Sequence, residues 1–141
     1  MIFLSRITEQ KSYFTPSFYS SFLFLTNVCT TAYFGYITYS IGFLILFITS
    51  IIVRLKYTTF TIVLDKIPIV FITVYGGYVF YQKLQEKINI LFCSGILFTF
   101  LATVYLYICI IPHPEYVALQ YILQALLHFI SCIGHHLIVL L

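Results

Sequence analysis

Residues 90 to 111 read ILFCSGILFTFLATVYLYICII and contain no charged side chain. An α-helix of about 20 mostly apolar residues is long enough to cross the hydrocarbon core of a bilayer. A strand of a membrane barrel would need only about ten residues, and its side chains would alternate between apolar and polar. In lipid, a helix satisfies its backbone hydrogen bonds within the segment, whereas an open sheet cannot. This stretch therefore predicts a transmembrane helix.

The composition of the whole chain points the same way. Of its 141 residues, 62% are hydrophobic and only 8% are charged, whereas soluble domains carry about 25% charged residues. So few charged side chains cannot cover the surface of a small water-soluble domain. The net charge of +3 is spread along the chain, so no basic patch is available for nucleic acid. We therefore expect the protein to be embedded in the lipid bilayer.

Five apolar stretches predict an all-α, polytopic transmembrane bundle of about five spanning helices. The expected spans cover about residues 16–36, 38–55, 60–82, 90–111 and 116–141. They form a single domain, residues 15–141, preceded by a short extramembrane segment, residues 1–14. The first span begins at Thr15 and Pro16, a capping residue followed by proline at the first helical position. Because the first two spans share only about 40 residues, a re-entrant pair is the alternative.

Basic residues predict the orientation of this bundle. In the five-helix arrangement one side of the membrane receives Arg6, Lys11, Arg54 and Lys56, and the other receives Lys83 and Lys87. Cytoplasmic loops carry the excess of Lys and Arg. The N-terminus is therefore expected on the cytosolic side and the C-terminus on the opposite side, and a re-entrant first pair would reverse the later loops.

The last span carries a stripe of polar residues. Spacings of four, four, three and four separate Gln120, Gln124, His128, Ser131 and His135. Residues with this spacing share one face of a helix. Polar side chains in lipid usually face the bundle interior, where they hydrogen-bond across helices. We expect the stripe to face inward and to meet Asn, Thr, Ser or Tyr side chains of other helices.

Some of these polar residues are expected to meet in one leaflet. Arg54 and Asp65 flank a short connection between adjacent helices, which predicts a salt bridge, with Asp65 to Lys66 or snorkelling as alternatives. Ser50 lies one turn before Arg54, and the last span enters from the same side. The candidate polar pocket therefore consists of Ser50, Arg54, Asp65, Gln124 and His128.

The four cysteines follow no metal-binding spacing. Each lies alone in an apolar run, at Cys29, Cys93, Cys109 and Cys132. Without a Cys-x-x-Cys pair or a zinc-finger pattern, they are expected to act as small buried hydrophobic residues. The adjacent His135 and His136 diverge by about 100° around the helix, so the pair is not expected to share one metal ion.

Three stretches resemble one superfamily of seven-helix membrane proteins, the alkaline ceramidases, adiponectin and progestin receptors and haemolysin-III-like proteins. The phrases TSIIVR, VLDKIPI and LLHFISCIGHHL carry the resemblance, and Ser50, Asp65 and His128 stand at matching positions. In that superfamily three histidines bind zinc, and the serine and aspartate assist a zinc-bound water that hydrolyses a lipid amide. The resemblance covers about residues 39–82 and 116–136.

The chain departs from the superfamily at two zinc ligands. Arg54 stands where the first histidine would fall, and Gln124 stands where the second would fall. A guanidinium remains protonated at neutral pH and would repel a cation, so the resemblance implies a lapsed or rearranged site. No cofactor is therefore expected, and zinc, with His128 as a ligand, belongs only to the hydrolase alternative.

These observations favour a small multi-pass protein that is not an enzyme. It would be a structural or assembly component of a membrane complex, or of a viral or organellar membrane, with the bilayer and other membrane subunits as partners. The alternative is a divergent ceramidase-like lipid amidohydrolase. A proton or ion conduit along the histidine stripe is a third hypothesis, which the small number of acidic residues disfavours.

Overall fold

The computed structural model describes residues 15–86, 88–110 and 117–141. Within these ranges every regular element is helical, which confirms the all-α prediction. The elements are α1 (Pro16–Ser21), α2 (Leu23–Tyr33), α3 (Ile37–Leu55), α4 (Thr59–Glu86), α5 (Ile90–Tyr105), the π-helical turn η2 (Leu106–Ile110) and α6 (Val117–Leu140). The expected N-terminal segment, residues 1–14, lies outside the described residues.

The first apolar stretch forms two short helices, α1 and α2, rather than one. The Thr15 side chain caps α1 by accepting from the backbone N–H of Phe18, and Pro16 occupies the first turn, as predicted. The helical pattern is interrupted at Phe22, and the chain continues directly into α2. From Pro16 to Tyr33 the pair covers about 27 Å at 1.5 Å per residue, which is close to the thickness of the hydrocarbon core.

Among the described residues, four helices are long and apolar enough to cross a membrane. The spanning segments are Ile37–Leu55, Thr59–Glu86, Ile90–Ile108 and Leu119–Leu140. Their bounds lie within a few residues of the spans expected from the sequence, although the ends near residues 111 and 116 fall outside the described residues. These helices fit an integral multi-pass membrane protein.

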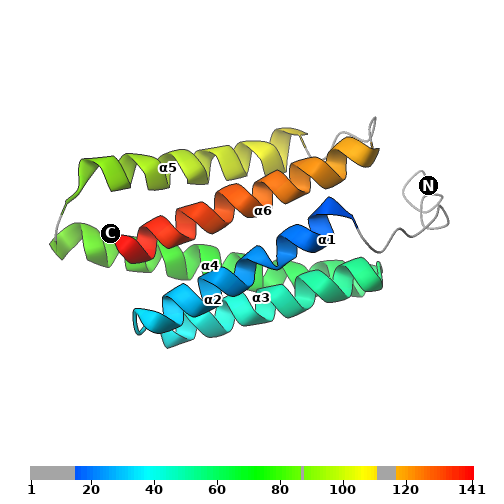
Figure 1. The fold of residues 1–141 in the computed structure, drawn as a ribbon, viewed down its shortest axis with the longest axis horizontal. Coiled ribbons are helices and arrows are strands. Elements are labelled where there is room, and N and C mark those ends of the chain that lie inside the picture. Colours follow the sequence, from blue (N-terminus) through cyan, green and yellow to red (C-terminus); the bar gives the residue numbers. More distant parts are fainter. Residues whose placement is uncertain (1–14, 87, 111–116) are drawn as a thin grey trace.

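Helix α6 lies at the centre of the bundle (Figure 1). It packs against α1, α2, α4 and α5, while α3 packs against α2 and α4. The start of α1 and the end of α6 lie at opposite ends of the bundle (Figure 1). The basic residues Arg54 and Lys56 lie at the α1 end, where α3 finishes.

A tight turn joins α2 to α3. Gly35 adopts φ +83°, in the left-handed region that residues with a side chain rarely occupy. Two backbone hydrogen bonds close the turn, from the Gly35 N–H to the Ala32 carbonyl and from the Tyr36 N–H to the Thr31 carbonyl. The glycine lets α3 fold back along α2 with only three residues between the helices.

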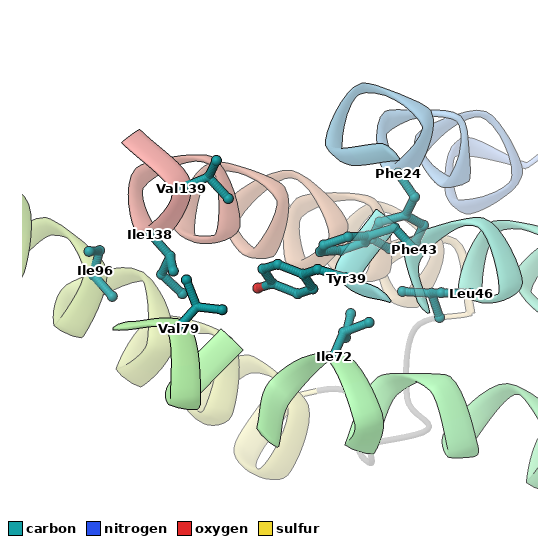
Figure 2. Packing of buried hydrophobic residues seen from close by; sticks show 9 residues of the cluster. All are labelled: Phe24, Tyr39, Phe43, Leu46, Ile72, Val79, Ile96, Ile138 and Val139. Carbon is teal, nitrogen blue, oxygen red and sulfur yellow. The ribbon is translucent and has the colours of Figure 1, made fainter. Parts of the chain in front are cut away.

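The hydrophobic core lies between α3, α4 and α6 (Figure 2). Its buried residues are Phe24, Tyr39, Phe43, Leu46, Ile72, Val79, Ile96, Ile138 and Val139. Helix α5 contributes little, since Ile96 is the one buried residue among positions 90–105. The core therefore fixes the rotation of α3, α4 and α6 about their axes, and this rotation places their polar side chains.

Candidate functional site

A polar cluster occupies the end of the bundle where α1 begins and α3 ends. Four helices contribute to it: α1, α3, α4 and α6. Its side chains are Ser17, Ser20, Thr49, Ser50, Arg54, Asp65 and His128. The cluster contains four of the five residues of the predicted pocket.

Asp65 of α4 is held by two hydroxyl groups of α3. The Ser50 hydroxyl donates to Oδ1 at 2.8 Å and the Thr49 hydroxyl donates to the same oxygen at 3.2 Å. All three side chains are buried. Hydrogen bonds to a charged acceptor are stronger than those between neutral groups. These two bonds therefore stabilise a carboxylate in a place where it would otherwise be costly.

Arg54 connects α3 to α1 and α6. Its Nη1 donates to the Ser50 carbonyl oxygen at 2.9 Å, and its Nε donates to Ser17 Oγ at 3.3 Å. Its Nη2 lies 3.4 Å from Nε2 of His128. Because an arginine can only donate, this contact requires that His128 Nε2 carry a lone pair.

The hydrogen bonds of His128 define its tautomer. Its Nε2 accepts from Arg54, so the ring proton resides on Nδ1, which lies 2.7 Å from Ser20 Oγ. Ser20 in turn donates to the Ser17 carbonyl oxygen at 3.1 Å. The ring also packs on Phe24, with 5.0 Å between ring centroids. Both nitrogens of a neutral imidazole are thus occupied by groups of the protein.

Two expectations about the pocket need correction. Arg54 and Asp65, which both lie in the described part of the chain, form no salt bridge. Each binds a different atom of Ser50, since Asp65 accepts from the Ser50 hydroxyl and Arg54 donates to the Ser50 carbonyl oxygen. The hydroxyls of Thr49 and Ser50 hold the carboxylate, while the guanidinium extends toward α1 and α6. Gln124 is half-buried one turn before His128, and no hydrogen bond joins it to the other four pocket residues.

Sequence reasoning missed the contribution of the first helix. Ser17 and Ser20 lie three residues apart in α1, so they share one face of the helix and reach Arg54 and His128 together. That spacing was a usable signal. Thr49 was missed because its neighbour Ser50 carried the recognisable motif.

The inward orientation predicted for the stripe on α6 is confirmed for the two histidines. His128 is buried in the cluster, and His135 hydrogen-bonds through Nδ1 to the hydroxyl of Tyr39, which is fully buried on α3. Gly76 of α4 lies against this pair, since a Cβ atom there would meet Tyr39 and His135. A second polar contact, far along α6 from the first, therefore joins α3 and α6, and α4 packs closely against it at Gly76.

The cluster does not fit the catalytic zinc that the resemblance implies. Within the described part of the chain, no three His, Cys, Asp or Glu side chains lie close enough together to hold one metal ion. A catalytic zinc has three protein ligands and one open position. Here the hydrogen-bond partner of His128 Nε2 is a guanidinium, which cannot coordinate a cation.

Comparisons with models of protein families, with curated proteins and with solved structures find no match. The resemblance to the ceramidase superfamily therefore rests on the matching residues of the three stretches in the sequence.

Proposed function

We propose that this protein is a small multi-pass membrane protein without a catalytic role, acting as a structural or assembly component of a membrane complex or of a viral or organellar membrane. The observation that carries this proposal is the position of Arg54. The guanidinium binds side chains of α1 and α6 and a carbonyl of its own helix. It thereby occupies the lone pair of His128 Nε2, the atom that a zinc ion would need as a ligand in the hydrolase alternative.

The satisfied hydrogen bonds of the cluster support a structural role. A charged side chain at the centre of a spanning helix costs about 2.5–3.5 kcal/mol on insertion scales, and an unpaired charge is also costly where Asp65 is buried near the end of the bundle. The cluster reduces this cost because each charged group has partners from another helix. It therefore specifies which faces of α1, α3, α4 and α6 pack together.

The outward faces of α4 and α5 support an assembly role. Large apolar side chains are exposed along both helices, including Phe60, Val70 and Val74 on α4 and Leu91 and Phe98 on α5. Such surfaces are stable only against lipid or against other membrane subunits. The bilayer and neighbouring subunits are therefore the proposed partners, with no part for nucleic acid.

A substitution of Arg54 tests the structural proposal. Arg54→Met keeps an unbranched stem but removes the guanidinium and all three of its hydrogen bonds. We expect a lower midpoint of thermal unfolding in detergent, by several degrees. Lys56→Met is the matched control, because Lys56 is exposed two residues later and its change should leave the midpoint within about one degree. Equal midpoints for the two variants would refute a structural role for Arg54.

The hydrolase remains the second candidate because Ser50 and Asp65 hydrogen-bond at 2.8 Å in the cluster that contains His128. Incubation of the purified protein with a fluorescent ceramide, with and without added zinc, separates the two functions. We expect no release of fatty acid above that of a His128→Ala variant. Hydrolysis that His128→Ala abolishes would overturn the non-catalytic proposal.

A further inference from the structure

A basic side chain of α4, that of Lys66, has no anionic partner among the described residues. Its Nζ atom lies 4.8 Å from the centre of the Tyr107 ring in the turn η2. The side-chain carboxylates of the described ranges belong to Asp65 and Glu86. Asp65 is buried and accepts from two hydroxyl groups of α3, and Glu86 lies about 30 Å farther along α4. The charge of Lys66 is therefore uncompensated in the described part of the chain.

The ammonium group of Lys66 also keeps its donors available. A lysine ammonium carries three N–H donors and accepts no hydrogen bond. Within the described ranges its one contact is with the face of the Tyr107 ring, which attracts the positive charge without supplying a hydrogen-bond acceptor. The ring therefore positions the charge and leaves it able to bind an anion.

The place of Lys66 along α4 brings its charge close to the membrane surface. The helix ends in the polar stretch QKLQE, residues 82–86. About 20 residues span the hydrocarbon core, so the core begins at about residue 62 of this helix. Lys66 then lies one turn, or about 6 Å, inside the hydrocarbon. Because Cβ atoms tilt toward the start of a helix, the four-carbon stem of the lysine carries the ammonium outward to the level of the lipid headgroups.

An exposed apolar stripe runs along α4 beside Lys66. Its members follow one another at spacings of four, three and four, which places them on one face of the helix. They are Val63, Ile67, Val70 and Val74. The first three and Lys66 line an open hollow of about 330 Å³. Farther along α4, Gly77 is exposed and carries no side chain. The distance from Lys66 to Gly77 is about 16 Å, close to half of the hydrocarbon thickness of about 30 Å.

We propose that this face of α4 binds one anionic phospholipid from the leaflet on the α1 side of the bundle. The lipid phosphate accepts from the Lys66 ammonium, and one acyl chain lies along the apolar stripe. Charge complementarity supports the anionic headgroup, because Arg54, Lys56 and Lys66 lie at this end of the bundle with a single described carboxylate, Asp65. Basic sites beside membrane helices bind anionic headgroups in this way. The site does not depend on whether the protein is catalytic.

A lipid suits this face better than a second copy of the chain. Two copies inserted with the same topology run parallel, so equivalent residues lie at equal depth in the membrane. The Glu86 side chain of a parallel copy would lie about 30 Å in depth from Lys66, and Asp65 is buried in its own bundle. Packing a second copy here would bury the ammonium without a described carboxylate, which is costly. A phospholipid supplies both the anion and the apolar chain.

Native mass spectrometry of the purified full-length protein in detergent tests the headgroup. The protein is titrated with phosphatidylglycerol and, separately, with phosphatidylcholine that has the same acyl chains. We expect one tightly bound phosphatidylglycerol per chain and weaker binding of phosphatidylcholine. Lys66→Gln should weaken phosphatidylglycerol binding about fivefold, which is the effect of one basic residue at an anionic membrane surface. Lys56→Gln is the matched control, because it removes the same charge from an exposed residue at the same end, and it should leave the affinity nearly unchanged.

A second pair of variants tests the acyl chain. Val70→Trp fills the hollow without changing any charge and should weaken phosphatidylglycerol binding, whereas Leu101→Trp on the exposed face of α5 should not. Inorganic phosphate in large excess should not displace the lipid, since it offers no acyl chain to the stripe. Equal binding of the two lipids, equal losses for Lys56→Gln and Lys66→Gln, or unchanged binding by Val70→Trp would overturn the proposal. Displacement by inorganic phosphate alone, or a dimer that retains no lipid, would do the same.

Discussion

Gly76→Ala is the substitution for which the structure gives the sharpest expectation. A Cβ atom at Gly76 would overlap the Tyr39 hydroxyl and approach Nδ1 and Cε1 of His135 to 3.2 and 3.3 Å. Tyr39 is fully buried and cannot move away without disturbing the core. Gly77, the next residue on α4, is exposed, and a Cβ atom there would meet nothing within 4 Å. The two positions therefore form a matched pair.

The magnitude follows from three effects. Either alanine gains about 1 kcal/mol in helix propensity over glycine. At Gly76 overpacking costs about 1–3 kcal/mol, and the loss of the Tyr39–His135 hydrogen bond costs about 1 kcal/mol more. We expect Gly76→Ala to lower the free energy of unfolding by about 1–3 kcal/mol and Gly77→Ala to leave it unchanged or raise it by up to about 1 kcal/mol.

The assay is unfolding in detergent, followed by the near-ultraviolet circular dichroism of the tyrosines. The chain has 13 tyrosines and no tryptophan, so this signal reports on tyrosine packing in the folded bundle. A further substitution, Tyr39→Phe, removes the hydroxyl that a Cβ at Gly76 would meet, and it should reduce the cost of Gly76→Ala. Equal stabilities of Gly76→Ala and Gly77→Ala would refute the close packing of α3, α4 and α6 at this point.

Three further predictions concern the pocket and the topology. Ser50→Ala should lower the free energy of unfolding by about 1–2 kcal/mol, because the hydrogen bond to Asp65 is lost. Ser94 is exposed on α5, so Ser94→Ala should change the free energy of unfolding by no more than about 0.5 kcal/mol. Equal losses for the two variants would count against the hydrogen bond between Ser50 and Asp65. The double variant Arg54→His with Gln124→His should bind zinc, whereas the unchanged protein should not. Near-stoichiometric zinc in the unchanged protein would contradict the interpretation that the zinc site of the superfamily has been lost. In sealed vesicles, a protease should cleave a tag at one chain end and leave a tag at the other end intact. If both tags are cleaved or both are protected, the two ends lie on the same side of the membrane, which would favour a re-entrant pair for the first two spans.

The sequence alone was enough to place the long helices, although it did not indicate that the first apolar stretch would divide into α1 and α2. The length of an apolar run decides whether a segment can cross a bilayer, and backbone hydrogen bonding in lipid then requires a helix. Both conditions are local, so the bounds of α3, α4 and α6 could be placed within a few residues. The cap at Thr15 is local for the same reason, because a side chain and a backbone group three residues apart form it.

The spacing of polar residues also determined part of the candidate site. The period of the stripe on α6 placed His128 and His135 on one inward face, because a helix repeats every 3.6 residues whatever packs against it. Ser50 and Asp65 were placed in one predicted pocket, and their side chains are hydrogen-bonded.

Only the tertiary structure decided which partner each polar group takes. Arg54 extends to Ser17 and His128 instead of to Asp65, since the packing of α1 and α6 places their acceptors within its reach. That choice depends on the rotation and depth of helices far apart in the sequence, which no local pattern encodes. The contact of Thr26 with Cys132 has the same origin. The packing of α2 against α6 brings together residues that lie more than one hundred positions apart, and the sequence pattern around an isolated cysteine does not predict such a contact.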